Sequence, residues 1–124
     1  MADEISLSFS LSFSKGGRYV DTSNFGSIGQ EIDVSGTDYI HKTQTIGTTA
    51  EALDIGDITT CGIMVVKNLD ASNYVEISRA TFTSGQGTVK LKAGEKYPFR
   101  LGSNTPYALA NTSPVEIEYM IFED

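Results

Sequence analysis

Two stretches of this sequence place an apolar side chain at every second position. Residues 5–13 alternate Ile, Leu, Phe, Leu and Phe with serines, and residues 115–121 carry Val, Ile, Tyr and Ile at alternate positions. A period of two puts successive side chains on opposite faces of a β-strand, whereas a helix would repeat about every 3.6 residues. Both stretches therefore predict strands with one buried face. The first would span roughly 30 Å at ~3.3 Å per residue.

The rest of the chain is divided into short segments by turn residues. Residues 39–46 predict a Thr-rich strand with weaker patterning, and residues 62–66 form a continuous apolar run that predicts a buried strand. Residues 68–73 are typical of a turn, and we expect residues 74–77 to be the hairpin partner of the preceding strand. Ala50–Leu53 has helical propensity but is too short for a stable helix, so one turn or an edge strand is expected.

Counting these segments gives about eight or nine strands with turn signals every 8–12 residues, a pattern typical of a sandwich or barrel. No segment is long enough for the helical crossover that parallel strands need. The fold class is therefore predicted to be all-β, a single-domain antiparallel β-sandwich of jelly-roll type. One domain is expected over residues 1–124, with residues 1–14 forming a long N-terminal strand able to exchange between subunits.

Composition excludes several classes of protein. Apolar residues make up 40% of the 124 residues, so the chain is not compositionally disordered. The net charge of −7, without a basic cluster, argues against binding to nucleic acid. The acidic N-terminus does not resemble a signal peptide, and no apolar run reaches the roughly 20 residues of a membrane helix. We therefore expect no membrane partner, and synthesis and folding in a reducing cytoplasm.

The sequence provides little for catalysis or for binding a metal or cofactor. His41 is the only histidine and has no nearby nucleophile motif, so we interpret it as a residue on a strand face. The single Cys61 is interpreted as a buried structural residue. Asp54 with Asp57 and Asp70 with Asn73 are interpreted as turn formers in preference to a calcium site. We predict no enzyme activity, no catalytic residue, no metal and no cofactor.

The apolar residues of the N-terminal third are the candidate interface. An alternating strand at the chain end can pair with another subunit, and exposed aromatic side chains are common at interfaces. The predicted partner-interface residues are Ile5, Leu7, Phe9, Leu11, Phe13, Tyr19 and Phe25.

Several blocks of the sequence resemble small proteins encoded in the structural gene clusters of tailed bacteriophages. They are residues 46–53, 68–77, 99–101 and 106–112, and the likeness covers a little under two thirds of the chain. The block at residues 68–77 is its most specific part. The resemblance implies a virion structural protein and carries over no catalytic residue.

A small acidic all-β chain with a long first strand suits a capsid decoration (cement) protein. We expect such a protein to bind the major capsid protein on the capsid exterior, to associate with itself as a trimer, and to stabilise the shell through many identical contacts. The alternative is a tail, adaptor or fibre-associated phage protein whose loops at residues 21–27 and 103–106 form a receptor- or glycan-binding surface. A β-sandwich binding module unrelated to phages and an enzyme are the remaining alternatives.

Overall fold

The computed structural model describes residues 4–24 and 29–124 of the chain. These residues form twelve strands and one short 3-10 helix, and no α-helix. All strand pairs are antiparallel. The all-β prediction is confirmed, although twelve strands replace the eight or nine that we expected. The chain divides into two compact units, Met1–Val34 and Ser35–Asp124, which we call the N-terminal unit and the C-terminal unit.

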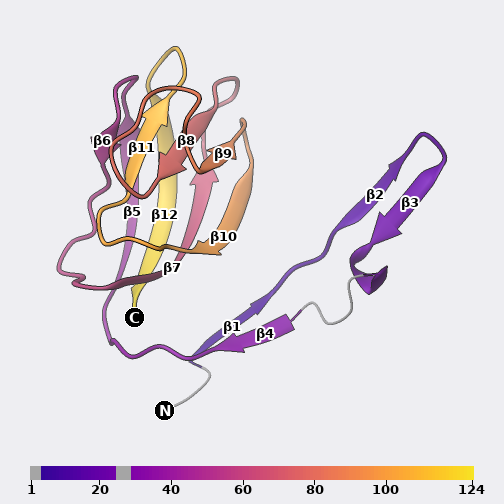
Figure 1. The fold of residues 1–124 in the computed structure, drawn as a ribbon, viewed down its shortest axis with the longest axis horizontal. Coiled ribbons are helices and arrows are strands. Elements are labelled where there is room, and N and C mark those ends of the chain that lie inside the picture. Colours follow the sequence, from indigo (N-terminus) through magenta and orange to yellow (C-terminus); the bar gives the residue numbers. More distant parts are fainter. Residues whose placement is uncertain (1–3, 25–28) are drawn as a thin grey trace. The chain divides into compact units, whose positions relative to one another are not determined.

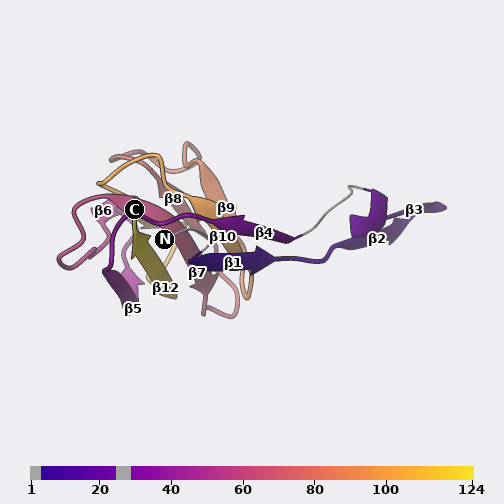
Figure 2. The same ribbon diagram turned by 90° about the horizontal axis from the view of Figure 1, so that it is seen from below.

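The N-terminal unit contains two separate strand pairs (Figure 2). Strand β1 (Ile5–Ser8) pairs with β4 (Gly29–Ile32), and β2 (Ser12–Lys15) pairs with β3 (Arg18–Asp21). The 3-10 helix η1 (Thr22–Asn24) follows β3. Each of the four strands is four residues long.

The prediction of one nine-residue strand over residues 5–13 is therefore wrong. Residues 9–11 lie outside any strand, between β1 and β2. The two halves of the alternating stretch take different partners, because β2 folds back directly onto β3 while β1 pairs with a strand that comes later in the chain. Alternation predicts which side chains share a face but does not choose the partner of a strand.

The C-terminal unit contains two four-stranded sheets (Figure 1). We call them the long sheet, in the order β10-β7-β12-β5, and the short sheet, in the order β6-β11-β8-β9. The strands of the long sheet are β5 (Tyr39–Ile46), β7 (Cys61–Asn68), β10 (Lys96–Arg100) and β12 (Val115–Glu123). The strands of the short sheet are β6 (Glu51–Ala52), β8 (Val75–Ser78), β9 (Val89–Leu91) and β11 (Tyr107–Ala110).

The strand pairs of this unit are nested along the chain. The first strand pairs with the last, β5 with β12, and the next pairs inward are β6 with β11, β7 with β10 and β8 with β9. Successive pairs belong alternately to the long and the short sheet. Two further pairings, β12 with β7 and β11 with β8, join the nested pairs into the two sheets.

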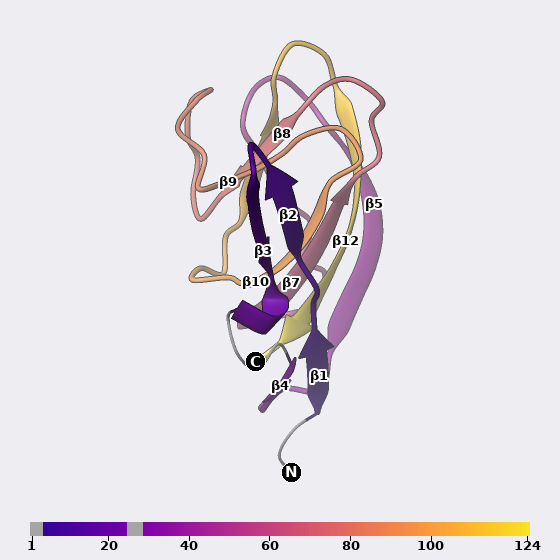
Figure 3. The same ribbon diagram turned by 90° about the vertical axis from the view of Figure 1, so that its right-hand side faces the viewer.

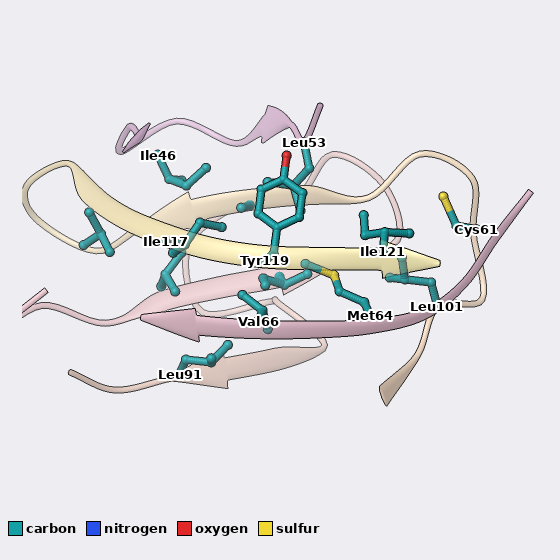
Figure 4. Packing of buried hydrophobic residues seen from close by; sticks show 14 of the residues in the cluster. Ile46, Leu53, Cys61, Met64, Val66, Leu91, Leu101, Ile117, Tyr119 and Ile121 are labelled. Carbon is teal, nitrogen blue, oxygen red and sulfur yellow. The ribbon is translucent and has the colours of Figure 1, made fainter. Parts of the chain in front are cut away.

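Buried side chains of both sheets form one hydrophobic cluster (Figure 4). In β12 the alternate residues Val115, Ile117, Tyr119 and Ile121 are at most 1% exposed, whereas Glu116 is exposed. The predicted alternation of residues 115–121 is confirmed. Burial of apolar area of this kind is the main force that holds two sheets together.

The loop at residues 68–73 carries the chain from the long sheet to the short sheet. The Asn68 side chain is fully buried, and its amide donates to the carbonyl oxygens of Asn73 (2.9 Å) and Leu91 (3.1 Å). Its carbonyl oxygen accepts the N–H of Asp70. The predicted turn is confirmed, but residues 74–77 are not a hairpin partner of β7, because β8 pairs with β11 and β9.

Candidate interaction surfaces

The β2–β3 hairpin closes through a turn of two glycines. Gly16 and Gly17 have φ angles of 61° and 78°, and a two-residue turn with positive φ at both positions is the type I′ turn. This turn matches the right-handed twist of the flanking strands. The sequence Lys15-Gly16-Gly17 therefore produces a tight hairpin and not merely the end of a strand.

One face of the hairpin is apolar and exposed. Phe13 lies opposite Val20, and the N–H of Thr22 donates to the Leu11 carbonyl at 2.9 Å, which continues the ladder by one position. Side chains two positions apart share a face, so Leu11, Phe13 and Val20 lie together. They are 56%, 49% and 45% exposed. We call these three residues the hairpin apolar face.

The opposite face of the hairpin carries Tyr19. Its hydroxyl donates to the Asp21 carboxylate at 2.8 Å, and this hydrogen bond raises the pKa of Tyr19. Tyr19 lies opposite Ser14, one position out of phase with Phe13. The structure thus places two residues of the predicted interface, Phe13 and Tyr19, on different faces of one hairpin.

The remaining residues of the predicted interface lie in different environments. Ile5 and Leu7 are half-buried in β1, where Ile5 lies opposite the buried Ile32. Phe9 lies between β1 and β2 and is 45% exposed. Phe25 lies outside the described residues, as does part of the predicted loop at residues 21–27.

A second candidate surface is the outer face of the long sheet. Here an open depression of about 200 Å³ lies over β5, β7, β12 and the start of β10. His41 Nε2 lies 2.7 Å from a carboxylate oxygen of Glu118, and the side chains of both are partly exposed. The residues around the depression include His41, Val65, Lys67, Lys96, Glu118 and Met120.

The residues that line this depression include His41 and Glu118 but no serine, threonine or cysteine. Nucleophilic catalysis would need a hydroxyl or thiol within hydrogen-bond reach of His41. Cys61 is buried elsewhere in the core, where desolvation raises the pKa of its thiol and disfavours the reactive thiolate. His41 lies on the exposed face of β5, as predicted from the sequence.

The carboxylates of the two turns that could be compared with a calcium site accept hydrogen bonds from the protein itself. The Asp54 carboxylate accepts from the Lys42 ammonium and the Gly56 N–H, and these contacts lower the pKa of Asp54. The Asp70 carboxylate accepts the N–H groups of Asn73 and Ser72, which lowers the pKa of Asp70. Within residues 4–24 and 29–124, no three His, Cys, Asp or Glu residues cluster as metal ligands would.

Sequence reasoning missed one buried charged residue, Glu76. It is only 4% exposed, and its carboxylate accepts the N–H groups of Gly85 and Gly87 at 2.9 Å each. A Cβ at Gly87 would lie 2.6 Å from Glu76 Cβ, so only glycine fits there. The signal in the sequence is the pair of glycines at residues 85 and 87, a pattern typical of a turn that does not reveal the buried carboxylate.

Comparison with protein-family models, with curated proteins and with solved structures found no match to this chain. In the described part of the chain no helix is long and apolar enough to span a membrane.

Proposed function

We propose that this chain is a structural protein of a bacteriophage virion, a capsid decoration (cement) protein that binds the head exterior. The observation that carries the proposal is the hairpin apolar face. Leu11, Phe13 and Val20 present large apolar side chains to solvent in a chain of net charge −7. Adjacent exposed apolar side chains on a soluble protein mark a contact with another protein.

The C-terminal unit is proposed to be a β-sandwich of jelly-roll topology. The nested pairing of its eight strands, with successive pairs alternating between two sheets, supports this topology. It is the arrangement that results when one long antiparallel hairpin is folded over so that its pairs alternate between two layers. Jelly rolls are common in viral capsid proteins, which agrees with a role in a particle.

The two units have different roles in this proposal. The C-terminal unit has its own core and provides a rigid body, whereas the hairpin apolar face contacts the major capsid protein or another copy of the chain. Binding at many identical positions on the shell then lets weak contacts stabilise it together. The protein is made in the bacterial cytoplasm, and it requires no cofactor in this role.

The first experiment is to separate heads and tails of the purified phage and to count copies of this protein in each by quantitative mass spectrometry. A copy number near that of the capsid subunit, confined to heads, is the expected result. A few copies in the tail fraction would overturn head decoration and favour the tail or fibre alternative.

A second experiment tests the hairpin apolar face directly. The variant Leu11→Ser, Phe13→Ser, Val20→Ser should lose binding to heads that lack the native protein. The control is Tyr97→Ser, which removes an exposed aromatic side chain from the C-terminal unit (42% exposed) and should bind normally. Normal binding of the triple variant would exclude the hairpin as the contact.

A further inference from the structure

The two sheets of the C-terminal unit have four edge strands, which differ in what they expose. In an antiparallel ladder, alternate residues direct both backbone N–H and C=O to the same neighbouring strand. The residues in between direct theirs away, and at an edge these groups have no partner within the sheet. Such an edge can pair with another chain unless short length, charge or proline prevents it.

The free edge of β10 is protected. The Asn68 N–H donates to the Glu95 carbonyl and the Leu101 N–H to the Gly62 carbonyl, so the odd-numbered residues of β10 bond to β7. The backbone N–H and C=O groups of the even-numbered residues are therefore directed away from the sheet. These residues are Lys96, Pro98 and Arg100, two cations and a residue without an N–H.

The edges of the short sheet offer little to pair with. Strand β6 has two residues and β9 has three. The Glu76 carboxylate also fixes the loop that enters β9. Short edges of this kind cannot form a stable ladder with another strand.

The edge at β5 is eight residues long and contains no proline, and its one lysine, Lys42, is paired with Asp54. The Glu123 N–H donates to the Asp38 carbonyl at 2.9 Å, which in this register directs the even-numbered residues of β5 toward β12. The Leu69 N–H donates to the Glu116 carbonyl, so the even-numbered residues of β12 face β7, in agreement. The residues of β5 that face outward are Tyr39, His41, Thr43 and Thr45.

These outward residues favour strand pairing. All four are exposed, and none is a lysine, an acid or a proline. The Tyr39 N–H donates to the Asp38 carboxylate, but the N–H groups of His41, Thr43 and Thr45 have no partner within the described residues. Strand β5 lies beside β12 at the border of the long sheet (Figure 3).

We propose that β5 is a dimerisation edge, which pairs antiparallel with β5 of a second copy about a two-fold axis at Thr43. In this register Thr43 lies opposite Thr43, Lys42 opposite Gln44, and Ile40 opposite Ile46. Thr–Thr pairs across strands are favourable, and no like charges meet directly. Moving the axis to Lys42 would place Lys42 opposite Lys42, which is unfavourable.

A second copy is favoured as the occupant because the edge complements itself. The chain as a whole is acidic, with a net charge of −7, yet the outward residues of β5 include no carboxylate. The inward Lys42 is paired with Asp54 of its own chain. The pairing joins two four-stranded sheets into one continuous sheet across the dimer. The β5–β5 pairing produces a dimer, whereas a trimer is expected from the sequence. This inference does not depend on the proposed role in a virion.

Disulfide trapping in the full-length protein tests the geometry. In the proposed dimer Thr43 forms a hydrogen-bonded pair with its own counterpart, with Cα atoms about 5.5 Å apart, a separation that a disulfide can bridge. Thr43→Cys should therefore give a covalent dimer under mild oxidation. Thr81→Cys, at an exposed loop position, should not. Equal yields, or no dimer at Thr43, would overturn the register.

Association in solution tests the edge independently. Analytical ultracentrifugation of the unmodified protein should show a dimer. Thr43→Lys should weaken association roughly tenfold or more, because two lysines then face each other across the axis. Thr81→Lys adds the same charge elsewhere and should associate normally.

A monomeric protein, or a Thr43→Lys variant that dimerises unchanged, would overturn the proposal. The Leu11→Ser, Phe13→Ser, Val20→Ser variant separates this edge from the hairpin apolar face. Loss of the dimer in that variant together with its retention in Thr43→Lys would assign dimerisation to the hairpin instead. Circular dichroism checks that each variant folds, and the cysteine variants test the edge even if a lysine variant does not.

Discussion

Glu76 shows how much one side chain contributes to the C-terminal unit. Replacing it with alanine would leave the N–H groups of Gly85 and Gly87 without their acceptor at a site where Glu76 is 4% exposed. We expect Glu76→Ala to lower the free energy of unfolding by about 3 kcal/mol. The measurement is urea denaturation, with Glu116→Ala on the exposed face of β12 as a control that changes stability by less than about 0.5 kcal/mol. Similar midpoints for both variants would contradict this role of Glu76.

Tyr119 makes stability depend on pH in the alkaline range. Its hydroxyl is 2.6 Å from the Asp54 carbonyl oxygen and 3.0 Å from Gln44 Oε1, and burial raises the pKa of Tyr119 from 10.0 to about 12. Figure 4 shows this hydroxyl at the margin of the cluster. Between these two pH values the unfolded chain binds fewer protons than the folded chain, so stability falls as pH rises.

We expect the native protein to lose roughly 3 kcal/mol more than Tyr119→Phe over these two pH units. Below pH 10 the variant should be less stable by about 1 kcal/mol, because it lacks the hydrogen bond. Denaturation midpoints measured at a series of pH values give both quantities. Parallel pH profiles for the two proteins would exclude Tyr119 as the cause.

At the scale of single elements, the glycine turn determines whether the β2–β3 hairpin forms. Gly16 has a φ of 61°, which asparagine tolerates and β-branched residues do not. We expect Gly16→Asn to preserve the hairpin and Gly16→Val to destabilise it by about 1–3 kcal/mol. NMR contacts between Phe13 and Val20, which lie opposite each other, provide the measurement. Equal contact intensities in both variants would show that the hairpin does not depend on this turn.

We expect the outward residues of β10 to prevent this edge from pairing with a strand of another chain. Lys96→Thr with Pro98→Val removes one charge and restores one N–H at the free edge. We expect this double variant to form species larger than the unmodified protein as concentration rises, measured by ultracentrifugation. Lys90→Thr, a lysine in β9 of the other sheet, is the control. No change in size would mean that β10 is protected by something other than these two residues.

The sequence predicted which segments form strands and which side chains share a strand face. It did not predict equally well which strands pair with each other. The strands at β5 and β12, the buried run in β7 and the turn after it were all visible, because each depends on local alternation or on turn residues. The sequence did not show the break at residues 9–11 or the position of β8 in the short sheet. Both depend on which strand, distant in the sequence, pairs more favourably with the segment. For residues 50–53 the sequence is compatible with a helical turn or an edge strand, and the structure contains the edge strand β6.

The interface was predicted only in part. Alternation placed Phe13 among the apolar residues of one strand face. The phase between Phe13 and Tyr19, however, depends on the two-residue turn, which fixes the register of the hairpin. The free edge at β5 could not be predicted from the sequence, because it depends on which residues of β5 form backbone hydrogen bonds with β12. Glu76 was missed for a similar reason, since its partners lie in a loop nine and eleven residues away.

At the scale of the whole molecule, the C-terminal unit should fold without the N-terminal unit. Every residue of the main hydrophobic cluster lies between Ile46 and Ile121, within Ser35–Asp124. We expect a chain of residues 35–124 to unfold cooperatively in urea, with a midpoint close to that of the same transition in the full protein. Circular dichroism and fluorescence should report coincident transitions. A fragment without a cooperative transition would show that the N-terminal unit is required for folding.

The nested pairing also bears on how the protein is made. Strand β12 lies between β5 and β7 in the long sheet, yet the ribosome synthesises it after the seven other strands of the unit. Until β12 leaves the exit tunnel, β5 and one side of β7 have no partner, and their apolar faces remain accessible to chaperones. We infer that this unit acquires its native structure only after β12 has left the exit tunnel, when this strand enters the middle of the sheet.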